Sequence, residues 1–344
     1  MTANETQTDT YTFSAKDLKS GLEVKWCAGC GDHAILNALQ QALPKLGHKH
    51  EDIAVISGIG CSSRFPYYIN TFGMHTIHGR ASAIATGVKL SNPKLHIWQI
   101  TGDGDALAIG GNHFIHTIRR NIDINMILFN NEIYGLTKGQ YSPTTKKGYI
   151  TKTSPMGTIE TPFNPGELAI GAQGKFFART VDNNIPLTTD IFVEAGQFKG
   201  TSLVEVLQNC VIFNHGTHSF VTDKEHKDDR QIVLKHGEPM FFGKDKNKGL
   251  KLNGFELEIV TIGENGITEK DILVHDAKMQ NPTLHLMLIN MKAPAFPVAM
   301  GVIRSVDDET FDDALIEQIT IAKSKSKNTG MDSFLMTGDI WEVK

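Results

Sequence analysis

An aspartate between two glycines and a later pair of asparagines are the residues of this chain best suited to bind a metal ion and a phosphate. The first group is Gly102-Asp103-Gly104, and Asn131, the second residue of the pair Asn130-Asn131, lies 28 positions after Asp103. A carboxylate and an amide oxygen are hard ligands, which magnesium combines with phosphate oxygens and water. Flanking glycines let the backbone approach a bulky anion. The paired motif predicts a magnesium diphosphate site, whereas a single Gly-Asp-Gly would be a weak signal.

The elements around the two motifs should bring them together. An apolar run at 96–100 precedes the glycine turn, and a helical stretch and a second apolar run lead to Asn131, which predicts strand, turn, helix, strand and turn. Consecutive parallel strands present their carboxyl ends on one edge, so Asp103 and Asn131 should lie side by side there. The N–H groups of Gly104, Asp105 and Ala106 would then begin a helix, where phosphate binds well.

Four cysteines form a second candidate site. They are Cys27, Cys30, Cys61 and Cys210. So few thiols in a large chain do not make a disulfide framework, which leaves metal binding, catalysis or simple burial as a small hydrophobic residue.

The positions of the cysteines favour ligation. Cys27 and Cys30 lie in a glycine-bearing loop ahead of a helical stretch, and a helix N-terminus favours thiolates. Cys61 follows a strand-like run at 53–57, and Cys210 follows another at 202–207. Four thiolates at one sheet edge predict a [4Fe–4S] cluster or a zinc site. Zinc sites commonly pair two Cys-x-x-Cys motifs, so one such motif with two single cysteines modestly favours the cluster.

The composition is that of an ordinary globular enzyme subunit. A chain of 344 residues with 40% hydrophobic and 21% charged residues holds one large α/β domain with an appendage, or two domains. The net charge of −4 argues against nucleic acid as a partner. No apolar run reaches the ~20 residues that cross a bilayer, and the N-terminus lacks the features of a secretory signal. We therefore expect a cytoplasmic protein without a membrane partner.

The longer string around the two motifs resembles a known family. GDGDALAIGGNHFIHTIRRN at 102–121, followed by NNEIYGLTKGQ at 130–140, is similar to thiamine-diphosphate enzymes and in particular to the β-subunit of 2-oxoacid:ferredoxin oxidoreductases. The resemblance extends from about Lys25 to about Phe220. It implies an α/β, thiamine-diphosphate-binding fold: a doubly wound, mostly parallel sheet with helices on both faces, plus a C-terminal arm.

The resemblance also implies roles for individual residues. Magnesium would be bound by Asp103, Asn131 and the main-chain oxygen of Ile133, and a [4Fe–4S] cluster by the four cysteines. The residues expected to contact thiamine diphosphate are Ile59, Gly60, Cys61, Ser62, His78, Gly104, Asp105, Gly135, Leu136 and Thr137. Three residues are predicted to be catalytic: Arg64, His78 and Lys138. Arg64 and Lys138 would anchor a substrate carboxylate, although a solvated surface charge is an equally common role for such residues.

Three parts of the chain are expected: a flexible N-terminal arm at 1–20, the diphosphate-type domain with the cysteines at 21–213, and a C-terminal extension at 214–344. The extension would pack on the core and on a partner subunit. Within it, 255–262 and 284–290 predict short strands and 309–323 predicts an amphipathic helix.

The implied reaction is a thiamine-diphosphate-dependent oxidative decarboxylation. A 2-oxoacid and the co-substrate CoA would give an acyl-CoA and CO₂, with electrons passing through the cluster to ferredoxin. The string looks closest to enzymes that act on 2-oxoglutarate, and pyruvate is the second candidate. A thiamine-dependent decarboxylase or carboligase with a structural zinc, and a non-catalytic electron-transfer or scaffold subunit, remain open alternatives.

One expected part of such an enzyme is missing from the chain. In related enzymes, the glutamate that activates the cofactor belongs to a second, pyrimidine-binding domain, and this sequence has one Gly-Asp-Gly and Asn-Asn half. The resemblance places the other half on an α-subunit. We therefore expect an α₂β₂ assembly with the active site at the interface, and no activity from this chain alone.

Overall fold

The structure is a computed structural model that describes residues 13–326, 330–336, 338–341 and 343. Its centre is an eight-stranded sheet with the strand order β2-β1-β3-β4-β6-β5-β11-β7. All neighbouring strands are parallel except β11, which runs antiparallel to β5. The strands are β1 (Ile53–Ser57), β2 (Phe72–His75), β3 (His96–Gly102), β4 (Asn125–Asn130), β5 (Phe176–Val181), β6 (Ser202–Leu207), β7 (Gln231–Leu234) and β11 (Val298–Ser305).

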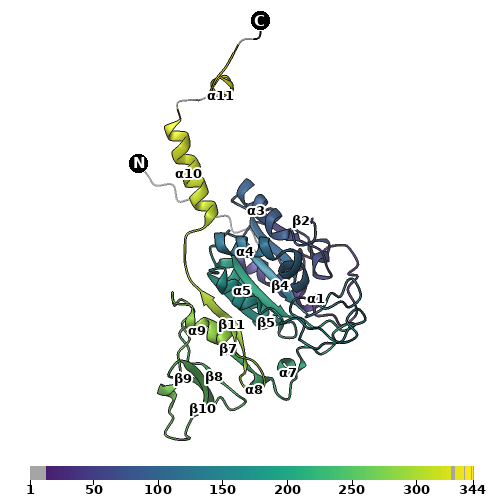
Figure 1. Cartoon of the computed structure of the whole chain (residues 1–344), viewed down its shortest axis with the longest axis vertical. Helices are drawn as coiled ribbons and strands as arrows, with labels where there is room; N and C mark the ends of the chain where they lie inside the picture. The colour runs from purple at the N-terminus through teal and green to yellow at the C-terminus, as the bar shows by residue number, and fades with distance from the viewer. Residues whose placement is uncertain (1–12, 327–329, 337, 342, 344) are drawn as a thin grey trace.

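Helices cover both faces of this sheet (Figure 1). They are α1 (Asp32–Ala42), α2 (Phe65–Tyr68), α3 (Ala81–Ser91), α4 (Gly111–Arg120), α5 (Pro165–Gly171), α6 (Ile185–Gln197), α7 (Ser219–Thr222), α8 (Lys227–Arg230), α9 (Thr283–Ile289), α10 (Phe311–Lys325) and α11 (Met331–Leu335). Helices α1 and α6 pack together on one face, whereas α4, α5 and α9 belong to the hydrophobic cluster on the other. The expected doubly wound α/β fold is confirmed.

The strand sequences explain why the sheet is buried on both faces. Successive side chains of a strand point to opposite faces, and in β4 Ile127 and Phe129 belong to one cluster while Met126 and Leu128 belong to the other. All six residues of β4 are buried. Apolar runs without alternation are therefore what this central position requires.

Part of the predicted N-terminal arm, from residue 13 on, contacts the core. Leu18 is fully buried, and its carbonyl oxygen accepts hydrogen bonds from the Asn70 backbone N–H and the Gln40 side chain. The backbones of Lys19 and Ile69 form an isolated antiparallel β-bridge. Leu18 thus attaches the described part of this segment to the core, although half of residues 13–20 are exposed; residues 1–12 lie outside the described part of the chain.

The C-terminal region is more than an appended arm. Its strands β7 and β11 complete the main sheet, so the expected division at 213/214 does not separate two independent cores. A smaller antiparallel sheet contains β8 (Phe241–Phe242), β9 (Lys248–Asn253) and β10 (Glu256–Thr261). The predicted strand at 255–262 and helix at 309–323 correspond to β10 and α10. In Figure 1, α10 leads away from the body of the molecule.

The strand predicted at 284–290 is wrong, because this segment forms α9. The leucines at 284, 286 and 288 alternate as in a strand, which explains the error. The start of the helix is fixed instead by Asn281, whose side-chain oxygen accepts hydrogen bonds from the backbone N–H and the hydroxyl of Thr283. Among the described residues, no helix is both long and apolar enough to span a membrane.

Candidate active site at the carboxyl edge of the sheet

A cavity of about 80 Å³ lies where β1, β3 and β4 end, and we call it the Asp103 cavity. It is lined by Asp103, Asn131 and Ile133, the three predicted magnesium ligands. All ten predicted cofactor contacts line it as well: Ile59, Gly60, Cys61, Ser62, His78, Gly104, Asp105, Gly135, Leu136 and Thr137. The parallel strand ends therefore bring the predicted residues together, as the sequence pattern indicated.

Asp103 is a carboxylate with an incomplete set of partners. Its side chain is 2% exposed, and Oδ2 accepts hydrogen bonds from Ser142 Oγ and Thr144 Oγ1, each at 2.5 Å. Burial raises the pKa of Asp103 to about 6, although both hydroxyls oppose this shift. A buried carboxylate whose charged form is disfavoured gains stability when a cation binds beside it.

The side chain of Asp105, a predicted cofactor contact, is hydrogen-bonded to several parts of the cavity wall. Its Oδ1 accepts hydrogen bonds from His78 Nδ1 at 2.6 Å and from the backbone N–H groups of Gly79 at 2.7 Å and Ile59 at 3.1 Å. Its Oδ2 accepts from Thr101 Oγ1 at 2.8 Å. The carboxylate is thus used to hold the walls of the cavity together and to orient His78.

The turn after β4 presents Asn131 and Ile133 to the cavity. Asn131 Oδ1 accepts from the backbone N–H of Ile133 at 3.2 Å, and Asn214 Nδ2 donates to the backbone oxygen of Asn131 at 2.9 Å. Tyr134 donates its hydroxyl to the backbone oxygen of Gly104 at 3.0 Å. A Cβ on Gly104 would lie 2.2 Å from the Tyr134 ring, so this position requires glycine.

A second cavity of about 200 Å³ is lined by Cys27, Cys30, Cys61 and Cys210, and we call it the cysteine cavity. Gln208 Nε2 donates to Cys30 Sγ at 3.3 Å. Burial is the main reason why the pKa values of the Cys30 and Cys61 thiols are raised. The pKa of Cys61 is raised to about 12. In the described part of the chain, no three His, Cys, Asp or Glu side chains are close enough to hold a single metal ion. The thiols instead surround a space several times the ~30 Å³ that one water molecule occupies.

The two cavities are neighbours with a common wall. Cys61, Asn131, Gly135 and Leu136 line both of them. A Cβ on Gly135 would lie 3.5 Å from the Cys61 sulfur and 3.6 Å from the Cys210 sulfur. A side chain at position 135 would therefore contact two of the four thiols.

The two candidate carboxylate anchors lie in different surroundings. Arg64 is half-buried and lines the cysteine cavity. Lys138 is exposed on the turn after β4, has a positive φ of 77° and lines neither cavity. His78, the third candidate, lines the Asp103 cavity.

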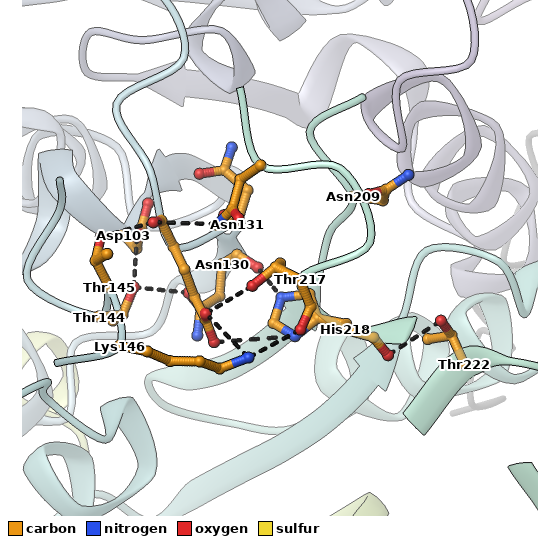
Figure 2. A network of polar contacts seen from close by, with 12 residues as sticks. Asp103, Asn130, Asn131, Thr144, Thr145, Lys146, Asn209, Thr217, His218 and Thr222 are labelled. Atoms are coloured by element: carbon orange, nitrogen blue, oxygen red, sulfur yellow. Dashed lines mark hydrogen bonds and ion pairs between the residues drawn. The ribbon is translucent and has the colours of Figure 1, made fainter. Parts of the chain in front are cut away.

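A buried polar network behind Asp103 was not foreseen from the sequence (Figure 2). Thr144 Oγ1 lies 2.9 Å from Asn130 Oδ1, and Asn130 Nδ2 donates to Glu205 Oε1 at 2.7 Å. Glu205 Oε2 in turn accepts from Arg179 Nε at 2.7 Å. These residues are far apart in sequence, and the only signal for them is that Asn130 and Glu205 are polar residues in apolar strands.

Comparison with known proteins identifies the domain to which the sheet belongs. Residues 58–206 match a family model described as "Thiamine pyrophosphate enzyme, C-terminal TPP binding domain". The fold and the carboxyl-edge site therefore define the thiamine-diphosphate-binding domain of an enzyme of this class.

Two similar chains identify the family more closely. The 2-oxoglutarate oxidoreductase subunit KorB of Mycobacterium tuberculosis is 46% identical, over 95% of this chain and 88% of the relative. A 2-oxoacid:ferredoxin oxidoreductase β-subunit of Aeropyrum pernix is 44% identical, over 59% of this chain and 64% of that relative. The chain belongs to the family of 2-oxoacid:ferredoxin oxidoreductase β-subunits.

A solved structure extends the similarity to the fold of the whole chain. It is the 2-oxoglutarate:ferredoxin oxidoreductase from Magnetococcus marinus with 2-oxoglutarate, coenzyme A and succinyl-CoA bound. The two chains are 27% identical with a TM-score of 0.76, covering 97% of this chain and 98% of the other.

Proposed function

We propose that this chain is the β-subunit of an enzyme that converts 2-oxoglutarate and CoA to succinyl-CoA and CO₂ and passes the electrons to ferredoxin. The observation that carries the proposal is the common wall between the Asp103 cavity and the cysteine cavity. A cofactor that holds the substrate and a redox group that removes electrons must lie close together for this reaction. The names of the M. tuberculosis and M. marinus relatives support 2-oxoglutarate as the substrate.

The residues of the Asp103 cavity fit magnesium and a diphosphate. Asp103 offers a buried carboxylate, and Asn131 and the backbone oxygen of Ile133 offer two further hard oxygen ligands. Gly60 has a φ of 143°, and a Cβ there would meet no atom within 4 Å, so its backbone faces open space. This combination of oxygen ligands and bare backbone is what a magnesium-bound diphosphate requires.

The residues of the cysteine cavity fit a [4Fe–4S] cluster. Four thiols around a single space match the ligand set of such a cluster. Gly135 leaves that space free where a side chain would otherwise contact Cys61 and Cys210. A single zinc ion would instead need four ligands within about 2.3 Å of one point.

When bound, thiamine diphosphate supplies the carbon nucleophile for the keto group of the substrate, and the cluster supplies a one-electron acceptor. The chain holds and orients these groups. Asp105 keeps the proton of His78 on Nδ1, so that Nε2 is free to accept a hydrogen bond from a bound group. Arg64, on the wall of the cysteine cavity, is our candidate for binding the second carboxylate of 2-oxoglutarate.

The exposed edge of the sheet supports an α-subunit as partner. All four residues of β2 are exposed at the sheet edge, and Phe72, Met74 and Ile77 expose between 47% and 72% of their surface just before His78. Large exposed apolar patches commonly mark interaction sites. We propose that an α-subunit covers this edge, completes the site with its pyrimidine-binding domain and gives an α₂β₂ assembly. A cytoplasmic location also stays a prediction.

The test is to purify the chain anaerobically with its α-subunit and to measure iron, sulfide and zinc together with absorption near 380–420 nm. About four irons and four sulfides per chain are expected for a [4Fe–4S] cluster. The second measurement is ferredoxin reduction with CoA and either 2-oxoglutarate or pyruvate. One zinc without iron would overturn the electron path, and faster turnover of pyruvate would overturn the substrate assignment.

A further inference from the structure

Two buried hydroxyls meet on one oxygen of Asp103. Ser142 and Thr144 are 2% and 4% exposed, and each places its hydroxyl 2.5 Å from Oδ2. None of the described side chains donates a hydrogen bond to Oδ1, and the backbone N–H of Gly104 is the one further donor to this carboxyl group among the described residues. The two oxygens of this carboxylate are therefore in unequal surroundings.

We propose that Ser142 and Thr144 are positioning residues for the metal ion, because they occupy Oδ2 of Asp103 and leave Oδ1 as the oxygen offered to the cation. This inference rests on the proposed role of Asp103 as a magnesium ligand. The torsion that rotates a carboxylate has a broad energy profile, so without partners the group would not keep one orientation. Donors behind a metal ligand orient it, and their loss typically weakens metal binding.

The hydroxyl of Thr144 has one proton, and besides Ser142 Oγ at 3.3 Å it has two closer acceptors. Asp103 Oδ2 is 2.5 Å away and Asn130 Oδ1 is 2.9 Å away. A hydrogen bond to a carboxylate is charge-assisted and short, so Thr144 donates to Asp103. Asn130 then limits the movement of Thr144. Asn130 is itself held in place, because its Nδ2 donates a hydrogen bond to Glu205 Oε1 at 2.7 Å.

The partner of Asn130, Glu205, is also held in place. Glu205 is 2% exposed and is held by both Asn130 and Arg179. The loop is tied to the metal-site turn as well, because Thr145 Oγ1 accepts from the backbone N–H of Ser142 at 2.7 Å and donates to the backbone oxygen of Glu132 at 2.6 Å. Thr144 is thus held by Asn130 on one hand and by the hydrogen bonds of its loop neighbour Thr145 on the other, and its hydroxyl is the group that contacts Asp103.

The test measures binding of Mn²⁺ as a probe of the magnesium site. The full-length chain with its α-subunit is stripped of metal and titrated with Mn²⁺ in the presence of thiamine diphosphate, with free Mn²⁺ followed by electron paramagnetic resonance. The variants are Ser142→Ala and Thr144→Val. We expect the Kd for Mn²⁺ to rise about 10- to 100-fold in each, which is the usual effect of losing an outer-shell partner.

Two further variants separate positioning from loop structure. Thr144→Ser keeps the hydroxyl and should retain the wild-type Kd. Thr158→Val is a matched control, because Thr158 is a buried threonine of the same loop whose hydroxyl donates to the backbone oxygen of Lys146 at 2.8 Å. It loses one hydrogen bond without touching Asp103, so its Kd should also stay at the wild-type value.

An unchanged Kd in Thr144→Val would overturn the inference. Equal weakening in Thr144→Val and Thr158→Val would overturn it too, because the effect would then come from the loop in general. If the wild-type complex with thiamine diphosphate bound no Mn²⁺ at all, the proposed metal site itself would be wrong, and the inference would fall with it. The variant and wild-type titrations thus report the two failures separately.

Discussion

Replacing Asp103 by asparagine should stabilise the metal-free chain while it removes metal binding. Asparagine fits the same space and still accepts hydrogen bonds from Ser142 and Thr144 through its oxygen. Burial raises the pKa of Asp103 from 3.8 to about 6. A shift of one pKa unit corresponds to about 1.4 kcal/mol, so keeping this carboxylate charged costs the folded chain about 3 kcal/mol.

The pH dependence follows from the direction of this shift. The folded-state pKa of Asp103 lies above the unfolded value, so the folded chain binds more protons between about pH 4 and pH 6. Stability therefore falls as the pH rises through this window, and the full loss is present above it. In Asp103→Asn this contribution is absent, and the difference in unfolding free energy should grow from near zero at pH 4 to about 3 kcal/mol at pH 7.5.

The assay is urea denaturation of the metal-free chain across this pH range, with and without Mg²⁺ and thiamine diphosphate. Added ligands should stabilise the wild type and leave Asp103→Asn unchanged, because only the wild type binds them. Asp105→Asn is the matched control, since Asp105 already accepts four hydrogen bonds and should lose about 1.5–3 kcal/mol when its charge is removed. Equal or lower stability of metal-free Asp103→Asn at pH 7.5 would refute the reasoning.

Three further substitutions test other parts of the site. Gly104→Ala should lose about 1–3 kcal/mol of stability through overpacking against the Tyr134 ring, measured by thermal unfolding, and Tyr134→Leu in the same chain should recover part of it. Arg64→Met should raise the KM for 2-oxoglutarate by more than the KM for pyruvate; equal changes would count against its role as the second-carboxylate anchor. Glu205→Gln should lower the free energy of unfolding by about 3–5 kcal/mol, because the buried Arg179 is left without its charge partner. The double variant Glu205→Gln with Arg179→Met should lose less stability. Additive losses of the two substitutions in urea denaturation would contradict this.

The sequence predicted the parts of the site that depend on strand ends. Asp103, Asn131, Cys61 and Cys210 each follow an apolar run, and parallel pairing is enough to place them on one edge. For this reason Asp103, Asn131 and Cys61 line the Asp103 cavity, and Cys61 and Cys210 line the cysteine cavity.

The contacts that came from distant segments were not predictable in the same way. Ser142 and Thr144 lie in a loop without periodicity, so nothing local indicates that both reach Asp103. Asp105 reads as a helix start, yet its carboxylate is used by His78 and two backbone groups from other loops. Polar contacts of this kind are set by the packing of the whole chain, which no local pattern records.

The insertion of β11 beside β5 has a consequence for how the chain is made. β5 ends at Val181 and its antiparallel neighbour begins at Val298, so one edge of β5 has no partner until the ribosome has synthesised the residues between them. At ~5–20 residues per second this takes roughly 6–24 s. An open strand edge is a template for pairing with other chains. Premature termination before residue 298 would therefore release a chain with an apolar central strand exposed, and such products should require chaperone binding or proteolysis rather than persist as a smaller folded domain.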